Sequence, residues 1–465
     1  MAVAQAELAR VDLPEFGTPT VEPLIGREEY ESRLRRVRDK SAERGLDALV
    51  VYGDREHSAN LAYLTGYDPR FEESLLVIAG DAPPALLVGN EGWGYSQISQ
   101  VRLERILYQP FSLMGQDRSR SRPLAEIIRE AGVRAGTSLG VIDWKYSQGQ
   151  DGATDRAWLC APSYLVDLLR DVTGRSPQSA TDLLMSPTDG LRATSGADQL
   201  ACFEFAATHI SSALHRVMLG LRPGLSEFEA MENARLNGLP LCLHPVLMAG
   251  PRAGTLGMAS PTSRRMRVGD PFLGGLGVWG ALSARAGFLA HDDHQLPEES
   301  RDYVDRLVKP YFAAIAEWYE HAGIGVKGGE LWEIIHRRLG DPFYGISLNP
   351  GHLLHLDEWV HSPIYPGSEI QLRSGMALQV DVIPATGGPY FTTNVEDGIA
   401  LADAPLREAM AARWPEAWSR IQARREFMRD KLGISLKPEV LPLSSLAGHL
   451  TPYVLDPTMA MRVAR

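Results

Sequence analysis

Short apolar runs and amphipathic stretches alternate along the first 180 residues of the chain. An apolar run that ends at glycine or proline is typical of a buried strand, and a charged stretch with apolar residues three and four apart is typical of a helix. The predicted strands are LDALVVYG (46–53), SLLVIAG (74–80), PALLVGN (84–90) and SLGVID (138–143), and the clearest helices are 27–44 and 123–133. This alternation predicts an α/β domain with a mostly parallel sheet.

The remaining chain has a different order of elements. A long helical pattern comes first, and a Pro-Gly turn then leads to Ser226 and Glu229, which have the spacing of a helix capping box. The later segments are a Gly-rich strand region (243–290), a helical region (300–340) and a second strand region (346–403). Helices followed by antiparallel strands predict an α+β domain, and we expect the boundary between the two domains at 181/182.

Composition and charge exclude several classes of protein. The chain has 465 residues, a net charge of −11 and only three cysteines. An acidic chain without a long basic run is a poor nucleic-acid binder, and three scattered cysteines do not form a disulfide framework. No apolar run approaches the roughly 20 residues of a membrane span, and the first residues do not resemble a signal peptide. We therefore expect a cytoplasmic protein that binds neither nucleic acid nor membrane.

Residues with catalytic potential concentrate in the last third of the chain. The stretch GHLLHLDEWVH (351–361) contains His352, His355 and His361, which is dense for a chain with 12 histidines. Asp381 interrupts an apolar strand, and Glu396 precedes another. A buried charge must be paired, bound to a metal or shifted in pKa. The alternatives are a solvated loop with incidental histidines and acids at the ends of strands.

A further polar cluster, HDDH (291–294), has the composition of a metal site. Its residues are adjacent, however, and neighbouring residues of a strand point to opposite faces of a sheet. We therefore interpret HDDH as a polar loop that follows a strand.

Several segments together resemble one known family. They are SANLAYLTGYDPRFEESLLVI (58–78), LRATSGADQL (191–200), RPGLSEFE (222–229), PGHLLHLDEWVHSPI (350–364), SGMALQVDVIP (374–384) and NVEDGIAL (394–401). In this order they are similar to segments of the creatinase/aminopeptidase P family, whose catalytic domain has the pita-bread fold. The resemblance implies an α/β N-terminal domain over 1–181, plus an α+β pita-bread catalytic domain over 182–465.

The resemblance also implies where a metal site would lie. Peptidases of this family hold two divalent ions with two Asp, one His and two Glu. His352 matches the histidine, Asp381 replaces the first glutamate and Glu396 matches the second, but Gly275 and Ala284 occupy the two aspartate positions. Two close dications need bridging anions. We therefore expect no metal cofactor, while a single divalent ion at His352, Asp381 and Glu396 stays open.

Creatinase in this family hydrolyses a C–N bond without metal, using a histidine on the loop before the metal-type strand. That loop here is 253–270, and Met258 occupies the matching position. His244, on the preceding strand, is the nearest substitute, with a core histidine as the alternative interpretation. The creatinase mechanism therefore cannot be transferred unchanged.

The most consistent prediction is a creatinase-like, metal-independent hydrolase or lytic enzyme that acts on a small amide, amidine or amino-acid-like substrate. His352 and His361 are the acid/base candidates, and Asp381 and Glu396 orient them or bind a cationic substrate. His244 and His355 are candidate substrate-binding residues. The alternatives are a metal-dependent Xaa-Pro aminopeptidase or dipeptidase and a non-catalytic binding protein.

The resemblance further implies a homodimer. In such a dimer, four residues of the N-terminal domain would line the partner's pocket: Arg55, Tyr63, Arg70 and Phe71. The proline-bearing segment 1–25 is expected to form an arm that lies across the other subunit.

Overall fold

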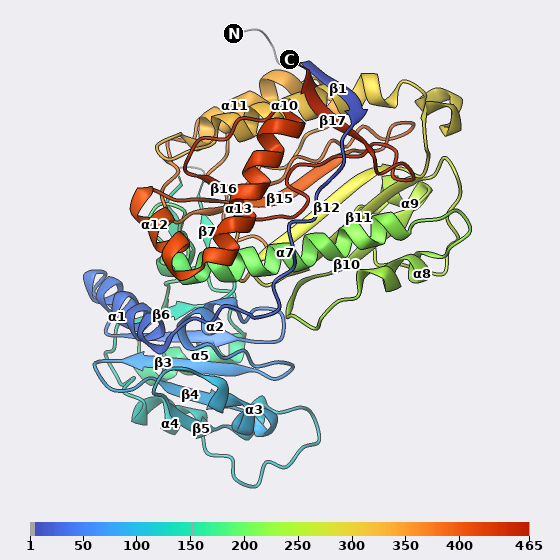
Figure 1. Cartoon of the computed structure of the whole chain (residues 1–465). Helices are drawn as coiled ribbons and strands as arrows, with labels where there is room; N and C mark the ends of the chain where they lie inside the picture. Colours follow the sequence, from blue (N-terminus) through green and yellow to red (C-terminus); the bar gives the residue numbers. More distant parts are fainter. Residues whose placement is uncertain (1–4, 150–151, 465) are drawn as a thin grey trace. The chain divides into compact units, whose positions relative to one another are not determined.

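A computed structural model describes residues 5–149 and 152–464, which divide into two compact units (Figure 1). The N-terminal unit is Ile25–Ala193, and the C-terminal unit combines Met1–Leu24 with Thr194–Arg465. The expected domains differ from these units at both ends of the N-terminal domain. Residues before Ile25 join the C-terminal unit because β1 (Gln5–Arg10) pairs antiparallel with β17 (Met459–Ala464). The segment after 181 stays in the N-terminal unit, where Asp182 forms a bidentate ion pair with Arg44.

The N-terminal unit contains a six-stranded sheet in the order β5-β4-β3-β2-β6-β9. Its strands are β2 (Ala48–Gly53), β3 (Ser74–Ala79), β4 (Ala85–Val88), β5 (Glu104–Leu107), β6 (Leu139–Ile142) and β9 (Gln178–Ser179). The sheet is mixed: three of its five strand pairings are parallel, while β3 runs antiparallel to both β2 and β4. The connection between β3 and β4 is only five residues long, too short for the crossover that parallel neighbours require.

Two of the six α-helices described in this unit, α1 (Arg27–Glu43) and α4 (Leu124–Glu130), lie close to the positions 27–44 and 123–133 that the sequence predicts. The others are α2 (Ala59–Thr65), α3 (Asn90–Tyr95), α5 (Ser163–Thr173) and α6 (Asp182–Met185), and a small hairpin pairs β7 (Ser147–Gln148) with β8 (Thr154–Asp155). Apolar residues of the sheet, α4 and α5 form one core.

The C-terminal unit contains an antiparallel sheet in the order β10-β11-β12-β15-β14-β13, and β16 also pairs with β15. Its strands are β10 (Leu241–Ala249), β11 (Pro271–Val278), β12 (Ala281–Phe288), β13 (His352–Leu353), β14 (Ala377–Val380), β15 (Asn394–Leu401) and β16 (Val440–Pro442). The antiparallel strands that the sequence predicts for this part of the chain are confirmed.

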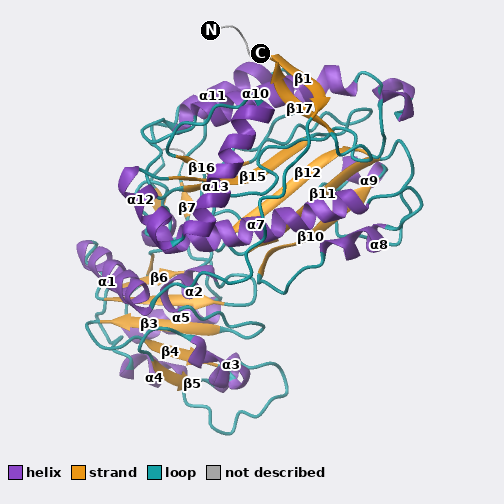
Figure 2. Ribbon diagram, in the orientation of Figure 1, coloured by secondary structure: helices purple, strands orange, loops and turns teal. Residues whose placement is uncertain are grey.

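Seven helices of the described residues accompany this sheet (Figure 2). They are α7 (Ala197–Gly220), α8 (Glu227–Met231), α9 (Pro251–Thr255), α10 (Lys309–His321), α11 (Gly328–Leu339), α12 (Ala404–Arg413) and α13 (Pro415–Phe427). The capping box expected at the start of α8 is present, with both Ser226 and Glu229 hydrogen bonded. The longest helix, α7, packs on β11 and β12.

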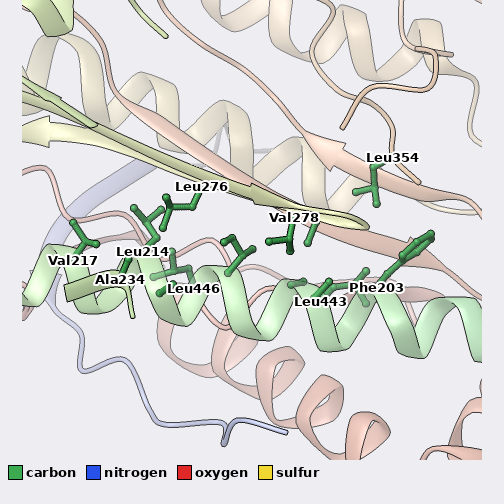
Figure 3. Close-up of a cluster of buried hydrophobic side chains, with 14 of the residues drawn as sticks. Phe203, Leu214, Val217, Ala234, Leu276, Val278, Leu354, Leu443 and Leu446 are labelled. Atoms are coloured by element: carbon green, nitrogen blue, oxygen red, sulfur yellow. The ribbon is translucent and has the colours of Figure 1, made fainter. Parts of the chain in front are cut away.

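The main core of the C-terminal unit lies between α7 and one face of the sheet (Figure 3). Phe203, Leu214 and Val217 of α7 face Leu276 and Val278 of β11. The other face of the sheet is therefore the one available for a site.

A glycine makes the tight β11–β12 hairpin compatible with this core. Gly280 has a φ of +89°, and a Cβ atom there would lie 2.6 Å from the Phe203 ring. Both the backbone conformation and the close approach of α7 therefore require glycine at this turn. Within the described residues, we find no helix with the length and apolar character to cross a bilayer.

Candidate functional site

Three residues that are distant in sequence meet in one buried site of the C-terminal unit. His352, Asp381 and Glu396 each offer a side-chain ligand atom, and these atoms lie within 4.8 Å of one another. The exposed fractions of the three residues are 0%, 4% and 6%. The three residues at which the sequence leaves a single divalent ion open thus lie close together.

Strand pairing explains why the three side chains meet. The β14–β15 register ends with Val380 opposite Asp397, so the next step places Asp381 beside Glu396. On the other edge of β14, His352 of β13 pairs with Gln379, two residues before Asp381. Residues two apart on a strand share a face, so the imidazole and the two carboxylates point to the same side.

A loop after β13 holds the imidazole from two sides. Glu358 Oε1 lies 3.1 Å from His352 Nε2, and the Trp359 ring stacks on the imidazole at a centroid distance of 4.1 Å. Asp381 Oδ2 lies 3.9 Å from the same nitrogen. Burial alone would lower the pKa of His352, but the two carboxylates outweigh it, and the pKa is raised. The site therefore favours an imidazolium.

The two carboxyl groups lack a matching positive charge. Burial raises the pKa of Asp381 to about 6, against the opposing effect of His352. Burial, followed by the charges of Asp381 and Glu358, raises the pKa of Glu396 well above its usual range. Across the described residues, no lysine or arginine forms an ion pair with either group, and Asp381 Oδ1 is buried without a hydrogen-bond partner. The site can accept one further cation.

The buried guanidinium of Arg285 lies on the opposite face of the sheet. Arg285 donates to Asp397 across 2.6 Å, and the backbone N–H of Gly448 donates to the same carboxylate oxygen. Asp397 directly follows Glu396 and therefore points away from the site. Arg285 thus does not neutralise the Asp381–Glu396 pair.

Gly275 and Ala284, where the resemblance to the creatinase/aminopeptidase P family would place two aspartates, lie in line with Glu396. Ala284 pairs with Glu396 across β12 and β15, and Gly275 pairs with Ala284 across β11 and β12. Cross-strand partners share one face of a sheet, so these three residues form a row. Val246 of β10 extends this row beyond Gly275. The side of the site next to Glu396 is consequently apolar, and Gly275 and Ala284 provide no bridging carboxylate.

The arrangement fits one divalent ion and does not fit two. Ligand atoms around one ion lie at most about 4.4 Å apart, because metal–ligand bonds measure about 2.0–2.2 Å. The three ligand atoms span 4.8 Å and need to move only slightly to meet this limit. Imidazole and carboxylate groups are both ligand types that suit divalent metals. A second ion lacks the bridging anions that would offset the repulsion between two dications.

The other three histidines named from the sequence do not join the three converging side chains. His361 is partly buried beside β13, where burial lowers its pKa. His355 is 1% exposed and packs edge-on against Phe203 of α7, so it belongs to the core rather than to an open substrate pocket. His244 is exposed on an irregular part of β10.

Two further segments agree with the sequence interpretation. HDDH (291–294) is an exposed turn, and the side chain of Asp292 caps it by accepting from the backbone of His294. Met258 is 69% exposed on the loop after α9.

The four residues of the N-terminal unit that were expected to line a partner's pocket differ in exposure. Arg55, Arg70 and Phe71 are exposed on the N-terminal unit. Tyr63 is 2% exposed, and its hydroxyl donates to the backbone of Leu191. The predicted substrate-binding role of Tyr63 therefore needs correction, because its ring is part of the interior of this unit.

Sequence reasoning left the residues around the three ligands without a role. Glu358 and Trp359 lie in the stretch 351–361, but the sequence indicated no role for either of them or for Asn394. Asn394 Nδ2 donates to Glu396 Oε2 at 3.4 Å. Asn394 lies two residues before Glu396, and this spacing within one strand is the signal that could have identified it. The position of Glu358 depends on how a loop folds back, which no periodic pattern encodes.

Comparisons with known proteins identify the fold. Residues 33–160 match the sequence profile of the Creatinase/Prolidase N-terminal domain. No curated protein matches the sequence. Among solved structures, the dipeptidase PepE from Mycobacterium ulcerans has a TM-score of 0.60 and 18% identity, covering 81% of this chain and 94% of its own.

Two further structures show the same architecture. The prolidase from Pyrococcus horikoshii OT3 has a TM-score of 0.60 at 16% identity and covers 80% of this chain and 95% of its own. A putative aminopeptidase P from Bacillus anthracis has a TM-score of 0.57 at 13% identity, with coverages of 88% and 99%. The chain thus has the pita-bread fold with a creatinase/prolidase N-terminal domain, as the sequence motifs predict.

Proposed function

We propose that this protein, which has a creatinase/prolidase N-terminal domain and the fold of prolidases and aminopeptidase P, hydrolyses a C–N bond of a small cationic substrate. The substrate class is an amide, amidine or guanidine that carries a positive charge at neutral pH.

One observation carries this proposal: two buried carboxyl groups and an imidazole face each other without a compensating arginine or lysine among the described residues. Two carboxylates side by side cannot both ionise cheaply in a buried site. A substrate guanidinium or ammonium offsets that charge, so binding and charge neutralisation occur together. Asp381 and Glu396 are therefore the residues proposed to bind the cation.

His352 is proposed to transfer the proton that hydrolysis requires. The imidazolium that the site favours donates its proton to the leaving nitrogen as the C–N bond breaks. The imidazole left behind takes one proton from the water whose oxygen bonds to the substrate carbon, so the step is balanced in atoms and charge. Glu358, 3.1 Å from His352 Nε2, stabilises the imidazolium before and after these transfers.

The N-terminal unit contributes to the proposal through a homodimer. Exposed Arg55, Arg70 and Phe71 would then lie at the partner's pocket, and His361 remains the second acid/base candidate. The absence of carboxylates at Gly275 and Ala284 argues against a dinuclear Xaa-Pro peptidase.

A matched substrate panel tests the proposal. Purified protein is incubated with small guanidino and amidino acids and with their neutral ureido and amide isosteres, and amine and ammonia release are measured. We expect turnover of at least one cationic member and a rate at least about tenfold lower for its neutral isostere, since a charge-assisted contact is lost.

Two variants complete the test. Glu396→Gln should remove turnover, whereas Glu369→Gln changes an exposed residue and should not alter it. Equal rates for charged and neutral isosteres, or turnover of Xaa-Pro dipeptides alone, would overturn the proposal.

A second candidate is a mononuclear metallohydrolase, which the span of 4.8 Å between the ligand atoms favours. His352, Asp381 and Glu396 would hold the ion, which would act as a Lewis acid on the substrate. Elemental analysis of protein purified without chelator separates the candidates. One Mn, Zn, Co or Fe per chain that is lost in Asp381→Asn would favour the metal, and well under one per chain would favour the metal-free enzyme.

A further inference from the structure

A mainly apolar pocket that two arginines border lies on the opposite face of the sheet from the catalytic candidates. It has a volume of about 150 Å³ and is bordered by α7, by the segment that leads into β10 and by Val278 of β11. Val278 belongs to the core that faces α7, as Figure 3 shows. Gly275 lies three residues earlier on the same strand and therefore faces the other side, with Ala284 and Glu396. This pocket is thus separate from the site described above.

Two arginines give the pocket its charge. Arg216 of α7 and Arg235 both border it, and burial together with the charge of Arg235 lowers the pKa of Arg216. Neither forms an ion pair with a carboxylate in the described ranges 5–149 and 152–464. Arg216 Nη2 donates to the backbone of Ala234 at 2.8 Å, and its buried Nε has no hydrogen-bond partner among these residues. The pocket therefore holds two guanidinium groups without a described counter-ion.

The remaining polar groups of the pocket already satisfy each other. Asn237 Nδ2 lies 3.1 Å from His209 Nδ1, and His209 Nε2 lies 2.9 Å from the carbonyl oxygen of Pro19. These partners assign the neutral tautomer, in which Nδ1 accepts and Nε2 donates. Burial and the charge of Arg216 both lower the pKa of His209, in agreement with a neutral ring. The two arginines are therefore the charged groups that a ligand would meet.

The rest of the lining is apolar and partly open. Leu236 and Leu241 at the pocket are 43% and 45% exposed, which is high for leucine beside a core. Ile210 and Leu239 complete the apolar wall. A ligand that carries an aliphatic group next to its charge would cover these side chains.

We propose that this pocket binds a short aliphatic carboxylate through Arg216 and Arg235. The planar guanidinium fork matches a carboxylate and forms paired hydrogen bonds with it. The volume of about 150 Å³ equals that of about five water molecules in the liquid, so the ligand has only about six heavy atoms. Butyrate is the simplest probe with these properties.

Calorimetry with butyrate and butanamide tests the assignment. The two probes share shape and chain length, and only butyrate is charged. We expect butyrate to bind at one site per chain and to raise the melting temperature with saturation, while butanamide and equimolar NaCl have no such effect.

Two pocket variants and one surface variant locate the binding site. Arg235 has a φ of 47°, so Arg235→Asn is compatible with its backbone, because asparagine tolerates the left-handed region. Arg235→Asn and Arg216→Gln should each weaken butyrate binding about tenfold, because each loses a charge-assisted hydrogen bond. Arg267→Asn, on an exposed loop, should bind as the unmodified protein does.

The proposal is overturned by three results: no butyrate binding at millimolar concentration, equal binding of butanamide, or butyrate binding that Arg235→Asn leaves unchanged. Because Arg235 is exposed, the variant is expected to fold, and its melting curve without ligand verifies this.

Discussion

The neighbouring acids Glu396 and Asp397 have opposite environments although both are buried. Asp397 forms an ion pair with Arg285 and accepts a backbone hydrogen bond, whereas Glu396 faces Asp381 and receives only a long hydrogen bond from Asn394. Residue type and burial alone therefore do not identify a functional carboxylate. The face of the strand decides which acid has a fixed partner and which can meet a ligand.

The Asp381→Asn variant distinguishes two interpretations of Asp381. Its carboxyl group either takes part in catalysis or is a remnant of a former metal site. Asparagine retains the shape but removes the charge that binds the substrate cation. We expect turnover of the best cationic substrate to fall at least about tenfold, because a charge-assisted contact with the substrate cation is lost. Because burial already disfavours the charged form of Asp381, the free energy of unfolding should not decrease at neutral pH.

Initial rates and urea unfolding curves measure the two effects. Asp12→Asn, at an exposed position, is the matched control and should change neither. A fully active and stabilised Asp381→Asn protein would support the interpretation as a remnant and contradict a catalytic role.

His449 makes the stability of the C-terminal unit depend on pH. Burial, followed by the charges of Arg285 and His215, lowers its pKa to about 3. The folded pKa lies below the unfolded value of about 6.5, so the unfolded chain binds more protons and stability is lost as pH falls through this window. Between pH 6.5 and 5.0 this residue should cost about 2 kcal/mol of unfolding free energy.

Urea unfolding at pH 7.5 and 5.0 tests the contribution of His449. His449→Gln should lose about 2 kcal/mol less between these two pH values than the unmodified protein, because a glutamine does not titrate. His294→Gln is the control, since that side chain is 86% exposed. The same loss of stability in both variants would show that other groups cause the pH dependence.

At the scale of elements, a row of cross-strand neighbours on β11, β12 and β15 shows that the site lacks two carboxylates. Gly275, Ala284 and Glu396 are cross-strand neighbours, and only the last has a polar side chain. The backbone at Gly275 has space for a Cβ atom, whose nearest contacts would be the Cβ atoms of Ala284 and Val246 at 3.5 and 3.7 Å. The scaffold therefore accommodates aspartates although the sequence does not supply them.

The double variant Gly275→Asp/Ala284→Asp should gain divalent-ion binding. Two carboxylates beside Glu396 would provide the bridging anions that two dications require. Elemental analysis after dialysis against MnCl₂ should show about two Mn per chain, an increase of at least one. The control Gly275→Asn/Ala284→Asn has nearly the same shape without the charge and should show no increase; equal metal contents in the two variants would refute the explanation.

Periodicity predicted the elements of both units because helices and strands impose a repeat on the sequence. The capping box at Ser226 follows from a local pattern, and it is present. The mixed order of the N-terminal sheet and the contact between Glu358 and His352 were not predicted. They depend on connection length and on the path of a loop, and neither leaves a periodic signal.

At the scale of the whole molecule, the pairing of β1 with β17 is a feature that the sequence did not predict. The segment before Ile25 has no repeat, so its sequence did not reveal that β1 pairs with β17, more than 440 positions away. An arm across another subunit was expected, but the described part of this segment pairs within its own chain.

The expected homodimer remains a prediction at this scale. Phe71 is 51% exposed on the N-terminal unit, and an exposed aromatic residue is a typical anchor of an interface. Sedimentation velocity at micromolar concentration should show a dimer, and Phe71→Ser should weaken it about tenfold or more. Phe228→Ser, which changes a 54% exposed phenylalanine of the C-terminal unit, is the control. A monomer at this concentration would contradict the prediction.

The rate of hydrolysis of the best cationic substrate by chelator-treated protein, measured as MnCl₂ is added, tests the central claim most directly. The substrate cation and a divalent ion would occupy the same place beside His352, Asp381 and Glu396. We therefore predict that chelation leaves the rate intact and that Mn²⁺ inhibits in competition with the substrate. Loss of the rate on chelation, with recovery as Mn²⁺ is added, would contradict a site whose cation is the substrate itself.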